Sequence, residues 1–138
     1  MADNQLLYKG NYMQKPDTHA ATIAALNDRL RHTFWGGKVM TTCGVNALPE
    51  ETRIKLFAAV QNFDDFVQHN AEPVHESGYF AHENDPYGEH DFGKVTVDGQ
   101  DFFFKIDYYD HTLCFGSENP ADTTITTRVL TIILASEY

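Results

Sequence analysis

The sequence feature that most constrains the fold is Asp98-Gly99, which separates an alternating run ending at Val97 from an aromatic-rich run starting at Gln100. Asp-Gly as a two-residue loop is typical of a type I′ β-hairpin. A turn at this position sets Val97 opposite Gln100 and Val95 opposite Phe102. Because side chains alternate along a strand, the predicted core face of the hairpin carries Val95, Val97, Phe102, Phe104, Ile106 and Tyr108.

The other face of the hairpin is predicted to mix polar and aromatic side chains: His90, Phe92, Lys94, Phe103, Lys105, Asp107 and Tyr109. The same register sets Phe92 opposite Lys105 and, where the ladder extends that far, His90 opposite Asp107. A one-residue slip would turn the apolar set to the wrong face, so the register is well specified. With Phe92, Phe103 and Tyr109 uncovered, this outer face is also the expected surface for a homodimer.

Two helices and two more strands are predicted outside the hairpin. Pro16-Asp17-Thr18 opens a first helix, which ends at Gly36-Gly37, and a second helix follows Pro49. The apolar stripes are Ile23, Leu26, Leu30 and Phe34 in the first helix and Ile54, Phe57 and Val60 in the second. Residues 38–43 are predicted to form a short strand. Residues 126–134 are apolar on both alternating sets, which favours a central buried strand, with a helix as the alternative.

The predicted fold class is α+β, a mostly antiparallel sheet of about four strands with both helices packed on one face. Residues 16–138 are expected to form a single domain, and residues 1–15 a flexible N-terminal arm. The stretch 68–87 lacks any regular pattern and is predicted to be a long loop that is either functional or mobile.

The charge of the chain is divided unevenly. Residues 62–122 hold 14 acidic residues and only two lysines, a formal balance of −12, against +2 for the remainder of a chain whose total is −10. Such a field disfavours nucleic acid and anionic membranes as direct partners and attracts cations or basic protein surfaces. The alternative is an acidic surface that only keeps the protein soluble.

Cysteine usage and hydropathy predict a cytoplasmic protein. Cys43 and Cys114 stand alone without a CxxC pattern, as in reduced compartments. No apolar run is long enough to span a bilayer, and the N-terminal residues show no signal-peptide pattern, so export is not expected.

His90 and Asp107 are the candidate catalytic residues, because the hairpin register sets them opposite one another on the outer face. A carboxylate beside an imidazole fixes its tautomer and favours its charged form, as in a general base. The competing interpretation is a structural hydrogen-bonded pair at the mouth of the hairpin, which such residues also form.

A divalent metal is the one cofactor considered, and none is required by any motif. The candidate ligands are His82, His90 and Asp107, whose nitrogen and carboxylate groups suit zinc, manganese or iron, but their spacing matches no established metal motif. The candidate partner-binding residues are acidic or aromatic: Glu83, Asp85, Tyr87, Glu89, Asp91, Tyr109 and Asp110.

Four short sequence motifs resemble those of a bacterial family known as domain of unknown function 3768. They are Ala-Leu-Asn-Asp-Arg-Leu-Arg at 25–31, Asn-Asp-Pro-Tyr-Gly-Glu-His-Asp-Phe-Gly at 84–93, Lys-Ile-Asp-Tyr-Tyr-Asp at 105–110 and Thr-Arg-Val-Leu-Thr-Ile-Ile-Leu-Ala-Ser-Glu-Tyr at 127–138. The resemblance implies a small cytoplasmic protein often met on bacterial plasmids and mobile elements. It implies no activity.

Two function hypotheses follow. The first, which we favour, is that the protein is not an enzyme but an acidic interaction module that docks on a basic protein surface. Such a module could be a mobile-element-encoded inhibitor or nucleic-acid mimic that acts on a nucleic-acid-binding protein. The second is a small metal-dependent or His/Asp-based hydrolase centred on residues 82–110.

Overall fold

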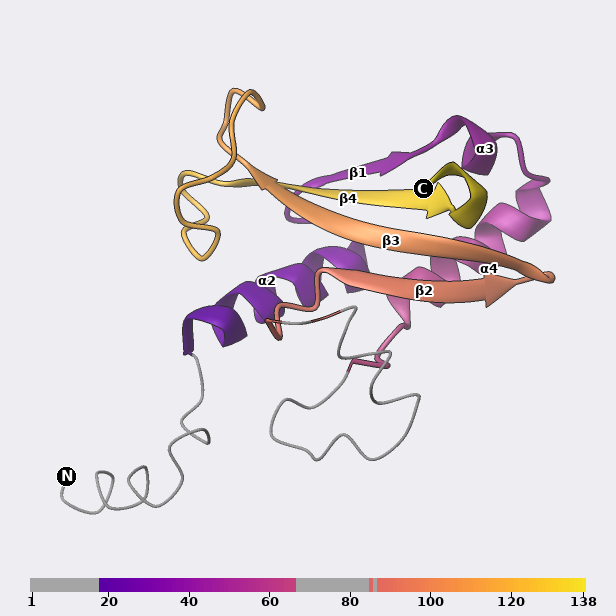
Figure 1. Cartoon of the computed structure of the whole chain (residues 1–138), viewed down its shortest axis with the longest axis horizontal. Helices are drawn as coiled ribbons and strands as arrows, with labels where there is room; N and C mark the ends of the chain where they lie inside the picture. The colour runs from indigo at the N-terminus through magenta and orange to yellow at the C-terminus, as the bar shows by residue number, and fades with distance from the viewer. Residues whose placement is uncertain (1–17, 67–84, 86) are drawn as a thin grey trace, which may run out of the picture.

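A computed structural model describes residues 18–66, 85 and 87–138, and these form an α+β fold around one four-stranded sheet (Figure 1). The expected arm at 1–15 and most of the expected loop at 68–87 lie outside the described residues. The elements, in chain order, are helix α2 (Thr18–Thr33), strand β1 (Lys38–Thr41), helix α3 (Cys43–Asn46), helix α4 (Glu50–Gln61), strands β2 (Phe92–Val97), β3 (Gln100–Tyr109) and β4 (Thr127–Leu134), and the 3-10 turn η2 (Ala135–Glu137).

The predicted hairpin is confirmed, with its register. Val97 pairs with Gln100, Val95 with Phe102, and Phe92 with Lys105. Asp98 and Gly99 have φ angles of 51° and 80°. Both central residues of a type I′ turn require positive φ, and Asp followed by Gly supplies it at low cost.

The strand order is β1-β4-β3-β2, with β4 antiparallel to β3 and parallel to β1. Strand β4 is therefore central and is covered by neighbours at both edges, which explains why its apolar residues occupy both alternating sets. The helix alternative for this segment is wrong. Parallel pairing of β1 with β4 makes the sheet mixed, but its other two pairings are antiparallel, as the fold class predicted.

Helices α2 and α4 pack on one face of the sheet (Figure 1). The core joins side chains from α2, α4 and the inner face of three strands: Leu30, Leu56, Val60, Val95, Val97, Phe102, Phe104, Ile106, Leu130 and Ile132. The predicted stripe of the second helix is partly wrong, since Ile54 is 61% exposed and Leu56 is fully buried in its place. Among the described residues no helix has the length and apolar content to cross a bilayer.

Gly93 permits the closest packing within this core. It pairs with Phe104 across the hairpin, and a Cβ at this position would lie 2.4 Å from the Phe104 ring and 2.9 Å from the Phe63 ring. The Phe63 and Phe104 rings are themselves in edge contact, with centroids 5.1 Å apart. The aromatic cluster over β2 therefore depends on a missing side chain.

We expect Gly93→Ala to lower the free energy of unfolding by about 1–3 kcal/mol, because the added methyl would lie closer to the Phe104 and Phe63 rings than van der Waals contact allows and would force them to shift. Gly116→Ala is the matched control, since its Cβ would meet only the Tyr108 carbonyl oxygen at 3.8 Å. We expect this control to change stability by less than about 1 kcal/mol. Urea unfolding of the two variants checks the difference, and equal midpoints would contradict the packing argument.

Candidate functional site

The candidate site is organised by polar residues on the buried side of α2. Asn27 is fully buried and Arg31 nearly so, and Asp28 lies between them at partial exposure. Asn27 and Arg31 are four residues apart and therefore point from the same side of the helix. A helix that buries an amide and a guanidinium must provide each with hydrogen-bond partners.

Asn27 provides partners for three other segments at once. Its Nδ2 donates to the Glu89 carbonyl oxygen at 2.9 Å and to the Tyr108 hydroxyl at 2.8 Å. Its Oδ1 accepts from Arg128 Nε at 2.8 Å, and the Tyr108 hydroxyl in turn donates to Glu89 Oε1 at 3.0 Å. The Arg128 guanidinium also lies 5.3 Å from the centre of the Tyr108 ring. This network joins α2 to β3, β4 and the segment that precedes β2.

Burial governs the ionisation of the two outer members of this network. The pKa of Tyr108 is raised above its usual value, chiefly because burial disfavours the phenolate. The pKa of Arg128 is lowered by burial, which the nearby Tyr108 and Glu89 oppose. At neutral pH Tyr108 is therefore a neutral hydroxyl, and it can donate to Glu89 while it accepts from Asn27.

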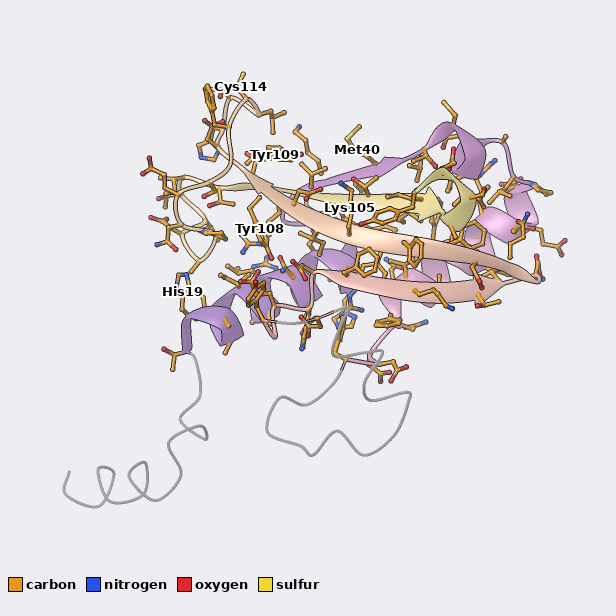
Figure 2. The ribbon with its side chains drawn as sticks, in the orientation of Figure 1. His19, Met40, Lys105, Tyr108, Tyr109 and Cys114 are labelled. Carbon is orange, nitrogen blue, oxygen red and sulfur yellow. The ribbon has the colours of Figure 1, made fainter. Side chains whose placement is uncertain are left out.

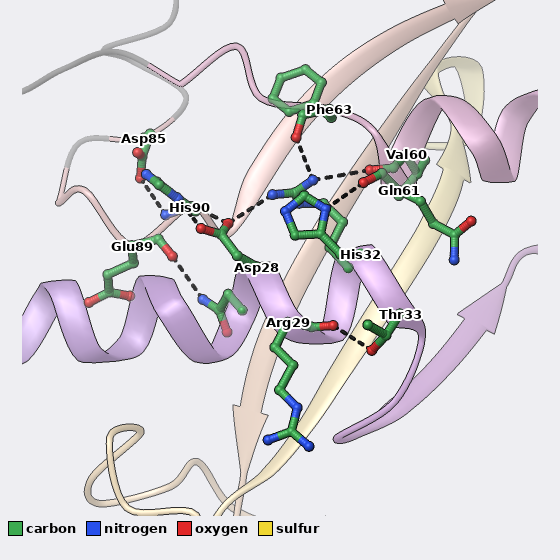
Figure 3. A network of polar contacts seen from close by, with 12 residues as sticks. Asp28, Arg29, His32, Thr33, Val60, Gln61, Phe63, Asp85, Glu89 and His90 are labelled. Atoms are coloured by element: carbon green, nitrogen blue, oxygen red, sulfur yellow. Dashed lines mark hydrogen bonds and ion pairs between the residues drawn. The ribbon is translucent and has the colours of Figure 1, made fainter.

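A second network centres on Asp28. His90 Nδ1 lies 3.0 and 3.1 Å from the two carboxylate oxygens, and Arg31 Nη2 lies 2.8 Å from one of them (Figure 3). Arg31 Nη1 donates to the carbonyl oxygens of Val60 and Phe63 at the end of α4. The Phe66 ring stacks on the His90 imidazole, with centroids 4.1 Å apart and planes at 4°.

The Asp28–His90 contact shifts both pKa values. The hydrogen bond to Asp28 raises the pKa of His90, against a smaller opposing effect of burial. Burial works to raise the pKa of Asp28, but the hydrogen bonds from His90 and Arg31 outweigh it and the pKa is lowered. Each group therefore favours the charged form of the other, as in an ion pair.

His90 reaches Asp28 because its backbone departs from the strand. Its φ is 58°, in the left-handed region, and its N–H donates to Asp85 Oδ1 at 3.0 Å. Histidine is among the residues that enter this region most readily, and Asp85, itself almost fully buried, holds it there. The antiparallel register between β2 and β3 ends at Phe92.

The predicted contact between His90 and Asp107 is therefore wrong. Once a residue with positive φ interrupts the strand, the alternation that set His90 opposite Asp107 no longer holds. Asp107 lies on the outer face and binds Lys105 Nζ at 2.9 Å. The residue that pairs with His90, Asp28, was not among the predicted site residues.

The carboxylates around Asp91 form what we call the acidic corner, made of Asp85, Glu89 and Asp91. Burial, together with the neighbouring charges of Glu89, Asp85 and, more weakly, Asp107, raises the pKa of Asp91 to about 6. The structure thus brings three predicted binding residues into one electrostatic cluster. A buried carboxylate beside like charges carries a free-energy cost that functional sites commonly accept.

The other predicted binding residues have varied positions. Tyr87 is 76% exposed and follows Asp85 closely in the chain. Tyr109 lies at the outer end of β3, bridged to Gly116. Asp110 accepts hydrogen bonds from the N–H groups of Thr112 and Cys114 and from the Thr112 hydroxyl, and so has a structural part in the β3–β4 turn. Glu83 lies outside the described residues.

The predicted metal ligands are not assembled in the part of the chain that the structure describes. Within residues 18–66, 85 and 87–138, no group of three or more His, Cys, Asp or Glu side chains is placed to hold a metal ion. His90 and Asp107 have the separate partners given above, and His82 falls outside the described residues. Metal binding by His82, His90 and Asp107 stays a prediction.

Residues 71–137 match the model of a family described as protein of unknown function (DUF3768). The predicted resemblance is confirmed over this stretch, which contains two of the four motifs in full, a third except for its last residue and, in the described part, the acidic corner, His90, Tyr108 and Arg128. The motif at 25–31, which contains Asn27, Asp28 and Arg31, precedes the matched stretch. No curated protein and no solved structure matches the chain.

We expect Asp91→Asn to stabilise the protein in a pH-dependent way. The folded state holds the Asp91 proton up to about pH 6, whereas an unperturbed aspartate carboxyl has a pKa of 3.8. The wild type therefore loses stability as pH rises through that window, and the variant does not. The stability difference, measured by urea unfolding, should be near zero at pH 3.5 and should grow to a plateau above about pH 6.

The control is Asp101→Asn, which makes the same change of charge on the exposed side of the hairpin near its turn. The contribution of His90, which declines as pH rises through its raised pKa, is present in every variant and cancels in the comparison. A gain for Asp91→Asn that is independent of pH, or no gain at all, would show that the Asp91 carboxylate is not destabilised by its surroundings.

Proposed function

We propose that the protein is a non-enzymatic interaction module that binds a basic surface of a partner protein through the acidic corner. The observation that supports this proposal is the separation of charge within the fold. Arg31 and Arg128 are buried and engaged by Asp28 and Asn27, so neither offers its charge to the surface. Asp91, by contrast, has its pKa raised to about 6 by burial and, in addition, by repulsion from the neighbouring charges of Glu89 and Asp85.

A cation from a partner would relieve this repulsion. An arginine or lysine placed beside Asp91 would favour the ionised carboxylate and lower its pKa, so binding and proton release are linked. Arginine suits such a site best because its planar guanidinium bonds to carboxylates in a bidentate manner. The exposed Tyr87, next to the acidic corner in the chain, supplies an aromatic contact of the kind enriched in binding hot spots.

The partner class that best fits is a nucleic-acid-binding protein, because its phosphate-binding surface is basic. The chain would then act as an inhibitor or nucleic-acid mimic, competing for a DNA or RNA groove. This part of the proposal rests on the −12 balance of residues 62–122 and on the mobile-element association that the resemblance implies.

We further propose that the protein acts in the bacterial cytoplasm. Cys43 and Cys114 are both exposed and both free, which supports a reducing compartment.

A synthetic arginine-rich peptide tests the proposal without knowledge of the natural partner. We expect it to perturb backbone NMR signals around Glu89 and Asp91, and to bind less tightly as pH falls below about 6 or as salt rises, because protons and counterions compete for the same carboxylates. The double variant Glu89→Gln/Asp91→Asn should weaken binding by about tenfold, on the scale of a partly desolvated charge pair.

The matched control is Asp98→Asn/Asp101→Asn, which removes the same charge at the turn of the hairpin. Here Asp98 is already engaged by Lys55 and Thr52, and Asp101 lies near Lys94. Equal loss of affinity in both double variants would show that binding depends only on net charge. The acidic corner would then not be the binding site. Affinity that does not change with salt would also contradict the proposal.

A hydrolase based on His90 is the second candidate function, with Asp28 in place of Asp107. One observation favours it: the Asp28 carboxylate binds Nδ1, and the described residues give Nε2 of the same ring no hydrogen bond. An imidazole held in this way accepts a proton from water at Nε2 while the carboxylate fixes its tautomer. Because the pKa of His90 is raised, this activity would need a higher pH than that of an unperturbed histidine.

Hydrolysis of p-nitrophenyl acetate separates the two candidates. If the hydrolase candidate holds, His90→Gln should lose about a hundredfold or more of the rate, and Asp28→Asn should shift the pH profile to lower pH because the partner charge is removed. His19→Gln, a histidine at the exposed start of α2, is the control. Equal rates for the His90 and His19 variants would contradict a catalytic His90.

A further inference from the structure

The outer face of the sheet has a charge opposite to that of the whole molecule. Alternation along the four strands places three lysines on it, Lys38, Lys94 and Lys105, against two aspartates, Asp101 and Asp107. The formal balance of these strand residues is +1, in a chain whose total is −10. Lys105 and Asp107 lie side by side at 2.9 Å, each a little over one third exposed.

The same face carries an aromatic cluster. Phe92 and Phe103 stack across the hairpin with ring centres 5.2 Å apart, and the Tyr138 ring lies 5.8 and 5.1 Å from them. Tyr138 remains 69% exposed and Met40, on the edge strand β1, 54%. In Figure 2 the Met40 and Lys105 side chains lie on the side of the sheet away from α2.

Tyr138 is held in place by its neighbour. The Glu137 carboxylate accepts hydrogen bonds from the N–H of Gly44 at 2.8 Å and from the N–H of Leu134 at 3.1 Å. These bonds fix η2 against α3 and β4, and the Tyr138 ring that follows lies against the Phe92 and Phe103 rings. A rigid exposed aromatic side chain loses little entropy on binding.

We infer that this outer face, lined by Met40, Phe92, Phe103, Lys105, Asp107 and Tyr138, binds a second copy of the chain. Two copies with a net charge of −10 each repel one another, and the repulsion is least where the surface is neutral or slightly positive. A face that carries Lys105 and Asp107 together is also self-complementary, as the two-fold symmetry of a dimer requires. Facing sheets then pack with their aromatic side chains between them.

The size of the face predicts a weak dimer. Strands spaced about 4.8 Å apart with a rise of about 3.3 Å per residue give a four-stranded face of roughly 500 Å² in plan. Interfaces of this size fall in the lower class, below about 1,200 Å² in total, where association is transient and depends on concentration.

Sedimentation equilibrium of the full chain over a range of concentrations tests the inference. We expect a monomer–dimer equilibrium that tightens as salt rises, because screening removes the repulsion between two acidic chains and leaves the apolar contacts. Met40→Asp and Tyr138→Asp should each weaken dimerisation by about tenfold or more, since each adds a charge where a partner copy would bury an apolar side chain. Both residues are exposed, so the monomer should keep its fold, which circular dichroism verifies.

Trp35→Asp is the matched control. Trp35 is 77% exposed in the link between α2 and β1, so its substitution removes as much exposed aromatic surface and adds the same charge, away from the sheet face. Loss of the dimer in the Met40 and Tyr138 variants but not in Trp35→Asp would support the inference. A wild type that is monomeric at every concentration, a dimer that persists in both face variants, or a dimer equally weakened by Trp35→Asp would overturn it. Salt is expected to strengthen the dimer and to weaken binding at the acidic corner. Either proposal can therefore be contradicted while the other stands.

Discussion

The buried amide of Asn27 is the interaction on which the arrangement around the candidate site depends. It donates to Tyr108 and Glu89 and accepts from Arg128, so one side chain fixes α2 against two strands and the segment before β2. Removing it would take one hydrogen-bond partner from the buried Arg128 guanidinium and one from the Tyr108 hydroxyl, and a buried polar group that loses a partner also bears a desolvation cost. Networks of this kind specify a unique arrangement when every member is satisfied.

The acidic corner lies in a fold whose buried arginines are bound inside the protein and whose strand lysines lie on the outer face of the sheet. Arg31 joins α2 to the end of α4, and Arg128 joins β4 to α2, so both guanidinium groups act inside the protein. The lysines of the strands point to the outer face of the sheet. Burial is the main cause of the raised pKa of Asp91, and the neighbouring carboxylates add to it. The buried arginines thus join the elements around the site, while the like charges of Glu89 and Asp85 act on Asp91.

Local rules explain which parts of this architecture could be predicted from the sequence. The Asp98-Gly99 turn fixes a register by counting, and the two-sided apolar pattern of residues 126–134 favours a central strand; both predictions were confirmed. His90 was misplaced because its positive φ depends on Asp85, a contact that no local pattern reveals. Asn27 and Arg31 were missed because a search for apolar stripes treats polar helix residues as exposed. Their spacing of four, on the side of Ile23 and Leu30, was the available signal.

The two proposed surfaces are compatible because they belong to different sides of the sheet. Asp91 continues the set of β2 residues that faces the helices, and its charge acts on Tyr108 on that same side. Dimerisation through the outer face would therefore leave both acidic corners accessible and would present them as a pair. A partner with two basic sites at a matching distance would gain affinity through the second, effectively intramolecular contact. A weak dimer is then sufficient, because the partner itself would stabilise the association by binding across it.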